Sequence, residues 1–224
     1  LLNELIADYV YTQPARARRL LAEQAVLYDA GHPRESDYYY YLHLGNLENQ
    51  EYDDQKAMIA FERAVVRVDE NGDIADKIEV YLDYLGTLAN LGKMKLAREY
   101  YDRSIRLMAS YPSDRLRARA LCRQGFLYLH NHSYAKATPK FMEADRLLAD
   151  KELVLTTKDH YFYTLVHTGL GTLWARPDSE DKAAVAFRRA ITRCEDNGLR
   201  ARLPWRQLNL GKVLMGTAAY GEAI

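Results

Sequence analysis

Three arginines spaced for one helical face are the side chains of this sequence best suited to bind an anion. Arg115, Arg119 and Arg123 follow one another at intervals of four residues, so a helix would carry them on one stripe. Positive charges on one stripe repel one another unless acidic groups meet them. Two interpretations are open: salt bridges to the preceding helix of the same protein, or charge-assisted hydrogen bonds to an acidic partner.

Four consecutive tyrosines, Tyr38 to Tyr41, are a second candidate for ligand contact. On a helix their side chains point in directions about 100° apart, so they cannot form a single stacking platform. Tyr41 precedes Gly45 by four residues and is expected in the core, whereas Tyr39 would be placed to stack on a ligand or hydrogen-bond with it. The alternative is that all four are amphipathic residues at the edges of packed helices.

Motifs for metal binding and catalysis are missing from the sequence. His130 and His132 have no Cys, Asp or Glu nearby at ligand spacing, which favours a solvated turn over a metal site. The run Asp69 to Asp73 resembles a calcium loop, but its glycine is at the fourth position instead of the sixth, which favours a helix cap. Gly169-Leu170-Gly171 resembles the start of a dinucleotide loop, yet it follows no strand, which favours a packing role within a helix. We therefore expect no enzymatic activity, no bound metal and no cofactor.

Composition argues against several further classes of protein. Lys and Arg together number 31, as do Asp and Glu, so the chain lacks the basic excess typical of nucleic-acid binding. No stretch is long and apolar enough to cross a bilayer, and we expect no membrane insertion by this segment. Cys122 and Cys194 are the only cysteines and are interpreted as buried reduced thiols. We expect a cytoplasmic protein, with the periplasmic part of a membrane-anchored sensor as the alternative.

A period of about 40 residues organises the sequence. Its clearest markers are alanines separated by 40, 40, 40, 46 and 40 residues: Ala17, Ala57, Ala97, Ala137, Ala183 and Ala223. Four residues after the first five alanines stand larger apolar side chains: Leu21, Phe61, Tyr101, Phe141 and Phe187. In most repeats another small residue follows three positions later, so one helical face reads small, large, small. Such a face lets a neighbouring helix approach closely.

Glycines recur in phase with these alanines. Four of them lie twelve residues before an alanine, and a fifth lies eleven before: Gly45, Gly125, Gly171 and Gly211, then Gly86. Glycine inside a helix costs about 1 kcal/mol relative to alanine, so its recurrence indicates close approach of another helix. Each repeat is therefore expected to be an antiparallel pair, with helix A carrying the glycine and helix B the small-large-small face.

The connections between repeats also have sequence signals. Gly72 and Gly198 each follow an asparagine and are expected to close a helix in a left-handed conformation. Tyr111-Pro112 occupies the equivalent place in another repeat, where proline ends one helix and opens the next. The six additional residues before Ala183 are assigned to the connection around Asp150 to His160.

This pattern resembles the tetratricopeptide repeat (TPR). The resemblance rests on Leu44-Gly45 with Ala57, Phe61 and Ala64; on Gly125, Tyr128, Tyr134, Ala137, Phe141 and Ala144; and on Trp174 with Phe187 and Ala190. It implies an all-α, right-handed superhelix of antiparallel helix pairs that binds a protein or peptide. The usual repeat has about 34 residues, so the helices here are expected to be longer. Long repeats of this kind are similar to those preceding bacterial sensor histidine kinases and helix-turn-helix regulators.

We expect a single repeat domain over 1–224. Its repeats are placed at about 1–31, 34–71, 73–110, 112–150, 160–198 and 200–224, the last of them truncated after its A helix. A terminal repeat normally ends in a polar capping helix, which is missing here. Trp205, Leu208 and Leu214 are therefore expected to leave apolar surface that packs on a second molecule, giving a homodimer, or is partly disordered.

The resemblance also implies a binding groove along the A helices. The expected groove residues are Tyr39, Asn46, Asp83, Thr87, Arg119, Cys122, Arg123, Phe126, Thr168 and Thr172. Asn46, Arg119 and Arg123 match positions at which carboxylate-clamp proteins of this family grip an acidic peptide terminus, although Leu42 and Tyr84 depart from that pattern. We expect a protein or peptide partner, with an acidic group at Arg119 and Arg123. The hypothesis is a sensory or scaffolding region of a larger bacterial protein; the alternative is a self-association module without a peptide ligand.

Overall fold

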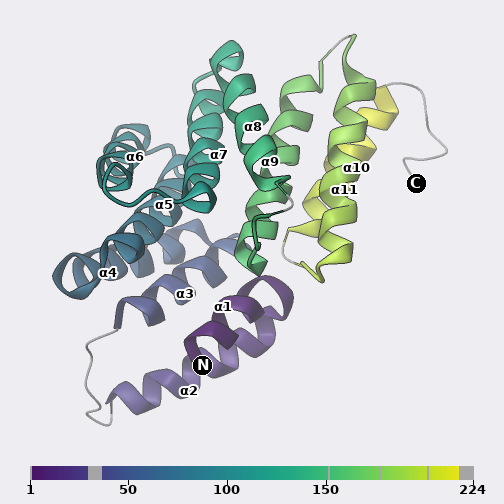
Figure 1. The fold of residues 1–224 in the computed structure, drawn as a ribbon. Coiled ribbons are helices and arrows are strands. Elements are labelled where there is room, and N and C mark those ends of the chain that lie inside the picture. The colour runs from purple at the N-terminus through teal and green to yellow at the C-terminus, as the bar shows by residue number, and fades with distance from the viewer. Residues whose placement is uncertain (1, 30–36, 151, 177, 201, 217–224) are drawn as a thin grey trace. The chain divides into compact units, whose positions relative to one another are not determined.

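The described part of the chain consists of helices joined by turns and short connections. The computed structural model describes residues 2–29, 37–150, 152–176, 178–200 and 202–216, which contain eleven α-helices and no strand (Figure 1). The chain divides into two compact units, Leu1–Leu116 and Arg117–Ile224. The expectation of an all-α protein is confirmed.

The N-terminal unit contains α1 to α6 and the first residues of α7. These helices are α1 (Leu2–Thr12), α2 (Pro14–Asp29), α3 (Asp37–Gln50), α4 (Asp54–Asn71), α5 (Ile74–Asn90), α6 (Met94–Met108) and α7 (Asp114–His130). The A helices α3 and α5 pack on the B helices α4 and α6 that follow them. Short turns join the partners of each pair, so they run antiparallel.

The C-terminal unit contains the remainder of α7 and the helices after it. These are α8 (Tyr134–Leu148), α9 (Thr157–Trp174), α10 (Glu180–Asp196) and α11 (Leu203–Gly216). Here α7, α9 and α11 are A helices, and α8 and α10 are B helices. The A helix α9 packs on α10, and α10 in turn packs on α11.

Glycine-to-phenylalanine contacts hold the helix pairs together. A Cβ atom added at Gly45 would lie 2.8 Å from the ring of Phe61, and one added at Gly171 would lie 2.9 Å from the ring of Phe187. Gly125 has the same relation to the buried ring of Phe141. These separations are shorter than van der Waals contact, so a larger residue cannot take the place of glycine without movement of the ring. The predicted close approach is confirmed.

The phenylalanine of α8 contacts two A helices. A Cβ atom at Gly169 of α9 would lie 2.4 Å from the Phe141 ring, and one at Gly125 of α7 would lie 2.6 Å from it. Phe141 is fully buried. Gly169 and Gly171 therefore both serve packing inside a helix, as the sequence predicted.

Most of the repeat alanines, and the larger side chains four residues after them, are buried, with one difference in the third repeat. The alanines Ala57, Ala97, Ala137 and Ala183 have no exposed surface. Tyr101, however, is only half-buried. Its neighbour Tyr100 contacts α5 instead, with its ring centroid 5.4 Å from Tyr81 and 4.9 Å from Tyr84.

The two asparagine-glycine turns differ from each other. Gly198 has φ of +63°, the left-handed conformation predicted for it. Gly72 has φ of −83° and ψ of 151°, so the left-handed prediction is wrong there. Its extended backbone leads into Asp73, whose side chain accepts a hydrogen bond from the backbone N–H of Asp76 at the start of α5. Glycine is still required, because a Cβ atom at Gly72 would lie 2.2 Å from the side chain of Val68.

The additional residues of the fifth repeat lie where the sequence placed them. Helix α8 ends at Leu148 and α9 begins at Thr157, so the longer connection falls between these two helices. Thr156 ends the connection in a capping box: its side chain accepts from the backbone of Asp159, while the Asp159 side chain accepts from the backbone of Thr156. Lys151 lies outside the described residues.

The exposed face of α11 differs in part from the prediction. Trp205 and Leu208 are 38% and 56% exposed, as expected for apolar side chains left on the surface. Leu214 is only 4% exposed, so the prediction for this residue is wrong. It packs with Val213 against Phe187 of α10, because the end of α11 already has a B helix beside it. Residues 217–224, expected to begin the next B helix, lie outside the described part, and dimerisation stays a prediction.

None of the described helices combines the length and apolar character needed to cross a membrane.

Replacing Gly45 by alanine is expected to lower the free energy of unfolding by about 1 to 3 kcal/mol, because the Phe61 ring must shift to admit the Cβ atom. The matched control is Gly216→Ala in α11, since a Cβ atom there meets nothing within 4 Å. The control should be neutral or stabilising, because alanine favours helix by about 1 kcal/mol. Urea unfolding followed by circular dichroism measures both variants, and equal stabilities would contradict the packing role of Gly45.

Candidate functional site

The predicted groove residues of the N-terminal unit lie along the contact between α3 and α5. The amide of Asn46 donates a hydrogen bond of 2.9 Å to the carboxylate of Asp83, and both side chains are buried. Thr87, also buried, accepts a hydrogen bond of 3.2 Å from Asn49. These polar groups therefore join two A helices. Binding of a partner by them stays a prediction.

Tyr39 is held by α5. Its hydroxyl donates to one carboxylate oxygen of Asp76 over 3.0 Å, and the hydroxyl of Tyr38 donates to the other over 2.5 Å. Burial and the Asp76 carboxylate raise the pKa of Tyr39, so the phenol stays protonated. Tyr41, expected in the core, is half-buried, and the guanidinium of Arg63 lies 5.6 Å from its ring centroid. A ligand that uses Tyr39 would share its hydroxyl with Asp76.

In the C-terminal unit, Arg119 forms a buried ion pair with α9. Its Nε donates to Asp159 over 2.8 Å, and its Nη2 lies 2.7 Å from the same oxygen. Burial alone would raise the pKa of Asp159, but the Arg119 guanidinium and hydrogen bonds from Thr156 hold it below its ordinary value. Arg119 is 4% exposed, so an acidic partner would have to displace Asp159 to reach it. The acid that meets this arginine comes from the next A helix, α9.

Cys122 and Thr168 are predicted groove residues that the structure places in the core. Both are fully buried, Cys122 on α7 and Thr168 on α9. Burial raises the pKa of the Cys122 thiol to about 12, so the thiol stays protonated at neutral pH. Cys194 is also buried, and the prediction of two buried thiols is confirmed.

Arg123, Phe126 and Thr172 keep part of their surface exposed. The Arg123 guanidinium lies 4.8 Å from the centroid of the Phe162 ring, a cation–π arrangement. Phe126 meets Phe141 edge to face, with ring centroids 5.1 Å apart. The Thr172 hydroxyl donates to a backbone oxygen one turn earlier in α9. These three residues are the members of the predicted set in the C-terminal unit that a partner could touch without displacing the core.

His132, in the turn between α7 and α8, contacts a tyrosine. Nδ1 of His132 lies 2.8 Å from the hydroxyl of Tyr134. Burial and the neighbouring His132 lower the pKa of His130. Within the described ranges, no three His, Cys, Asp or Glu side chains are grouped so that they could hold a metal ion.

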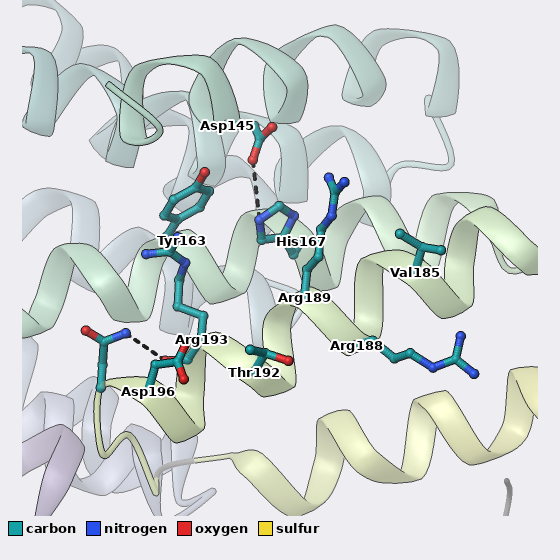
Figure 2. A pocket seen from close by; sticks show the side chains of 10 residues that line it. Asp145, Tyr163, His167, Val185, Arg188, Arg189, Thr192, Arg193 and Asp196 are labelled. Carbon is teal, nitrogen blue, oxygen red and sulfur yellow. Dashed lines mark hydrogen bonds and ion pairs between the residues drawn. The ribbon is translucent and has the colours of Figure 1, made fainter. Parts of the chain in front are cut away.

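A pocket of the C-terminal unit was not anticipated from the sequence. It has a volume of about 530 Å³ and lies among α8, α9 and α10 (Figure 2). Its lining combines three arginines, two aspartates, two ring side chains and smaller groups: Asp145, Tyr163, His167, Val185, Arg188, Arg189, Thr192, Arg193, Asp196 and Asn197. A pocket of this size fits a small ligand or a few side chains of a partner. We call it the arginine pocket.

Ring stacking orders one wall of the arginine pocket. Tyr163 and His167 lie one turn apart on α9, with ring centroids 5.0 Å apart and planes inclined by 22°. The Arg193 guanidinium lies 3.8 Å from the Tyr163 ring centroid, and its Nη1 lies 3.2 Å from Nδ1 of His160. Figure 2 shows Arg189 extending to the same side of α10, beside His167. The wall therefore holds two guanidinium groups against two stacked rings.

His167 is neutral at physiological pH. Burial lowers its pKa to about 4, the Asp145 carboxylate 3.4 Å away opposes this effect, and Arg189 and Arg193 add to it. The pKa of Tyr163 is raised by burial and by Asp145. The pocket therefore carries its positive charge on the arginines of α10 alone.

The fully buried Arg206 of α11 was also not anticipated. Its Nη2 donates a hydrogen bond of 2.6 Å to the hydroxyl of Thr164 on α9.

The sequence did contain a signal for the arginine pocket, since Tyr163 and His167 on α9 are four residues apart, as are Arg189 and Arg193 on α10. No such signal exists for Arg206, whose neighbours come from another repeat.

Comparison with known proteins identifies the fold. No family model matches the chain, and no curated protein matches its sequence. The crystal structure of BtubC (BKLC) from P. vanneervenii is similar with a TM-score of 0.59 and 21% identity, covering 94% of this chain and 85% of that one. A Rap protein in complex with competence and sporulation factor gives a TM-score of 0.74 and 14% identity, covering 92% of this chain and 55% of that one.

The apo form of RapI gives a TM-score of 0.57 and 16% identity, covering 84% of this chain and 66% of that one. The chain thus spans about half the length of the first Rap protein and two thirds of RapI. These likenesses concern the fold, which is an all-α, TPR-like repeat of helix pairs, as predicted.

Removing one partner of the buried ion pair is expected to be more costly than removing both. Arg119→Met leaves the Asp159 carboxylate buried without its guanidinium and should lower the free energy of unfolding by about 3 kcal/mol. The double variant Arg119→Met with Asp159→Leu should lose less than the sum of the single variants. Urea unfolding of all four proteins measures the coupling, and strictly additive losses would show that the pair does not stabilise the fold.

His167 is expected to make the protein less stable in mild acid. Unfolded histidine binds a proton near pH 6.5, whereas folded His167 does so near pH 4, so protons favour the unfolded state between these values. From pH 7 to pH 5 this residue should lower the free energy of unfolding by about 2 kcal/mol. His167→Gln should remove that part of the pH dependence in urea unfolding at the two pH values. An unchanged slope in the variant would contradict the low pKa.

Proposed function

We propose that this chain is a protein- or peptide-binding module. The observation that carries the proposal is the arginine pocket, which offers stacked rings, cations and hydrogen-bonding groups together on a helical repeat. Repeat folds of this kind expose extended surfaces suited to binding polypeptides. The similar Rap protein was solved in complex with competence and sporulation factor, which supports the same class of role here.

The module is proposed to be the sensory or scaffolding region of a larger bacterial signalling or regulatory protein. The partial coverage of the Rap protein is compatible with further regions beside a domain of this fold. We propose no catalytic activity and no cofactor for the segment itself, because its sequence lacks the required motifs. A cytoplasmic location is proposed, with the periplasmic part of a sensor as the alternative.

Self-association is the second candidate function. Trp205, Leu208 and Met215 lie three or seven residues apart on α11, so they share one helical face, and all three are exposed. An apolar helix face of this kind is typical of an interface between proteins. Leu208→Glu would disrupt it without touching the arginine pocket.

An array of immobilised peptides of varied sequence, probed with the purified chain, tests the first proposal. We expect saturable binding to a subset of peptides, with dissociation constants in the micromolar range. This corresponds to a binding free energy of about −8 kcal/mol. Analytical ultracentrifugation of the wild type and of Leu208→Glu tests the second. Failure of every peptide, together with a dimer that Leu208→Glu abolishes, would replace the first proposal with self-association.

A further inference from the structure

We propose that the arginine pocket binds a carboxylate side chain of an acidic peptide segment, held by Arg189 and Arg193. This inference rests on the proposed function and specifies the chemistry of the partner. It places the acid among α8, α9 and α10, away from the buried Arg119.

Among the described residues, Arg189 and Arg193 have no acidic partner. They lie four residues apart on α10, where like charges repel each other. Among the residues that the structure describes, no carboxylate lies within salt-bridge distance of either guanidinium. Arg193 instead contacts the Tyr163 ring and a nitrogen of His160. A ligand carboxylate would accept hydrogen bonds from both arginines and remove the repulsion.

The equivalent arginine of the N-terminal unit does have an acidic partner. Arg103 follows Ala97 by six residues, just as Arg189 follows Ala183, so the two occupy the same position of the repeat. Arg103 donates a hydrogen bond of 3.0 Å to Glu99, one turn earlier on α6. The residue one turn before Arg189 is Val185, which lines the arginine pocket. The acid that neutralises Arg103 is therefore replaced by an apolar side chain at the pocket.

Helix α8, the B helix before α10, places its acids differently from α4. In α4, Glu62 and Asp69 accept hydrogen bonds from Tyr84 and Tyr81 of α5. In the repeat of α8, the equivalent positions are Met142 and Ala149. Helix α8 therefore lacks two acids that bind tyrosine hydroxyls in the N-terminal unit, and its Asp145 lines the arginine pocket instead.

The mixed lining of the pocket favours a peptide over a phosphate ion. Asp145 and Asp196 also line it, and they would repel a dianion while accepting hydrogen bonds from backbone N–H groups. Tyr163 and Val185 offer apolar surface beside the charges. A glutamate or aspartate side chain within a peptide supplies a single carboxylate, N–H donors and apolar methylene groups together. The volume of about 530 Å³ exceeds what one phosphate ion would fill.

Fluorescence anisotropy tests the proposal with a short, fluorescein-labelled peptide of alternating glutamate and serine. The control probe has glutamine in place of every glutamate. The wild-type chain should bind the glutamate probe more tightly than the glutamine probe by on the order of tenfold. Arg189→Ala with Arg193→Ala should abolish that preference. The single variant Arg189→Lys should retain only part of the preference for the glutamate probe, because lysine cannot form the bidentate pair that arginine forms with a carboxylate.

Two matched variants show whether the effect belongs to the pocket. Arg103→Ala removes the equivalent, already neutralised arginine of α6 and should leave the affinity unchanged. Lys182→Ala removes an exposed charge from the start of the same helix, outside the pocket lining, and should also leave the affinity unchanged. Circular dichroism confirms that each variant is folded. Losses of affinity of equal size in the two controls and in the Arg189→Ala, Arg193→Ala double variant would indicate nonspecific charge attraction and overturn the proposal.

The remaining outcomes separate this inference from the proposed function. Equal affinity for the two probes, or no binding of the glutamate probe, overturns the acidic pocket, while the peptide array still decides the broader role. Inorganic phosphate that displaces the glutamate probe at concentrations below those of unlabelled peptide would make the site an anion site without peptide specificity, which also overturns the proposal.

Discussion

The contact between a helix glycine and a buried phenylalanine is the constraint on which the repeats depend. At Gly45, Gly125 and Gly171 the backbone of an A helix lies against the phenylalanine ring of its B helix, with no room for a Cβ atom. Small residues on either side of each ring complete the face and are buried with it. Because the contact needs both residues at a fixed spacing, it also fixes the register of the two helices. The other contacts within these three helix pairs follow that register.

Polar side chains join one A helix to the next. Asn46 with Asp83, Arg119 with Asp159, and Thr164 with Arg206 are buried pairs separated by 37, 40 and 42 residues, close to the repeat period. A buried polar group without a partner is costly, so each pair favours one alignment of neighbouring repeats over its alternatives. Three of these residues, Asn46, Asp83 and Arg119, were expected to face a ligand. Here they illustrate how a longer helix pair can use its inward polar residues for internal contacts.

Most of the repeat architecture could be predicted because spacing alone carries it. The alanine and glycine positions gave the helix pairs, the burial of Phe61 and Phe141, and the place of the long connection before α9. The partner of Arg119 and the conformation of Gly72 could not be predicted, since each depends on atoms that tertiary packing brings near. The arginine pocket was missed for a related reason. Its lining comes from α8, α9 and α10, and tertiary packing decides which of their side chains face the same cavity.

The ring of Phe141 has a consequence for how repeats can be exchanged. It is shared between Gly125 of its own repeat and Gly169 of the next, so the same side chain closes both the contact within a repeat and the contact between repeats. The stability of a repeat protein is the sum of the stability of each repeat and of the interfaces between neighbours, and a shared residue contributes to both. We therefore expect the fourth and fifth repeats to unfold together. Recombination or duplication that cuts between them would separate a glycine from its ring, whereas moving both together keeps the interlock intact.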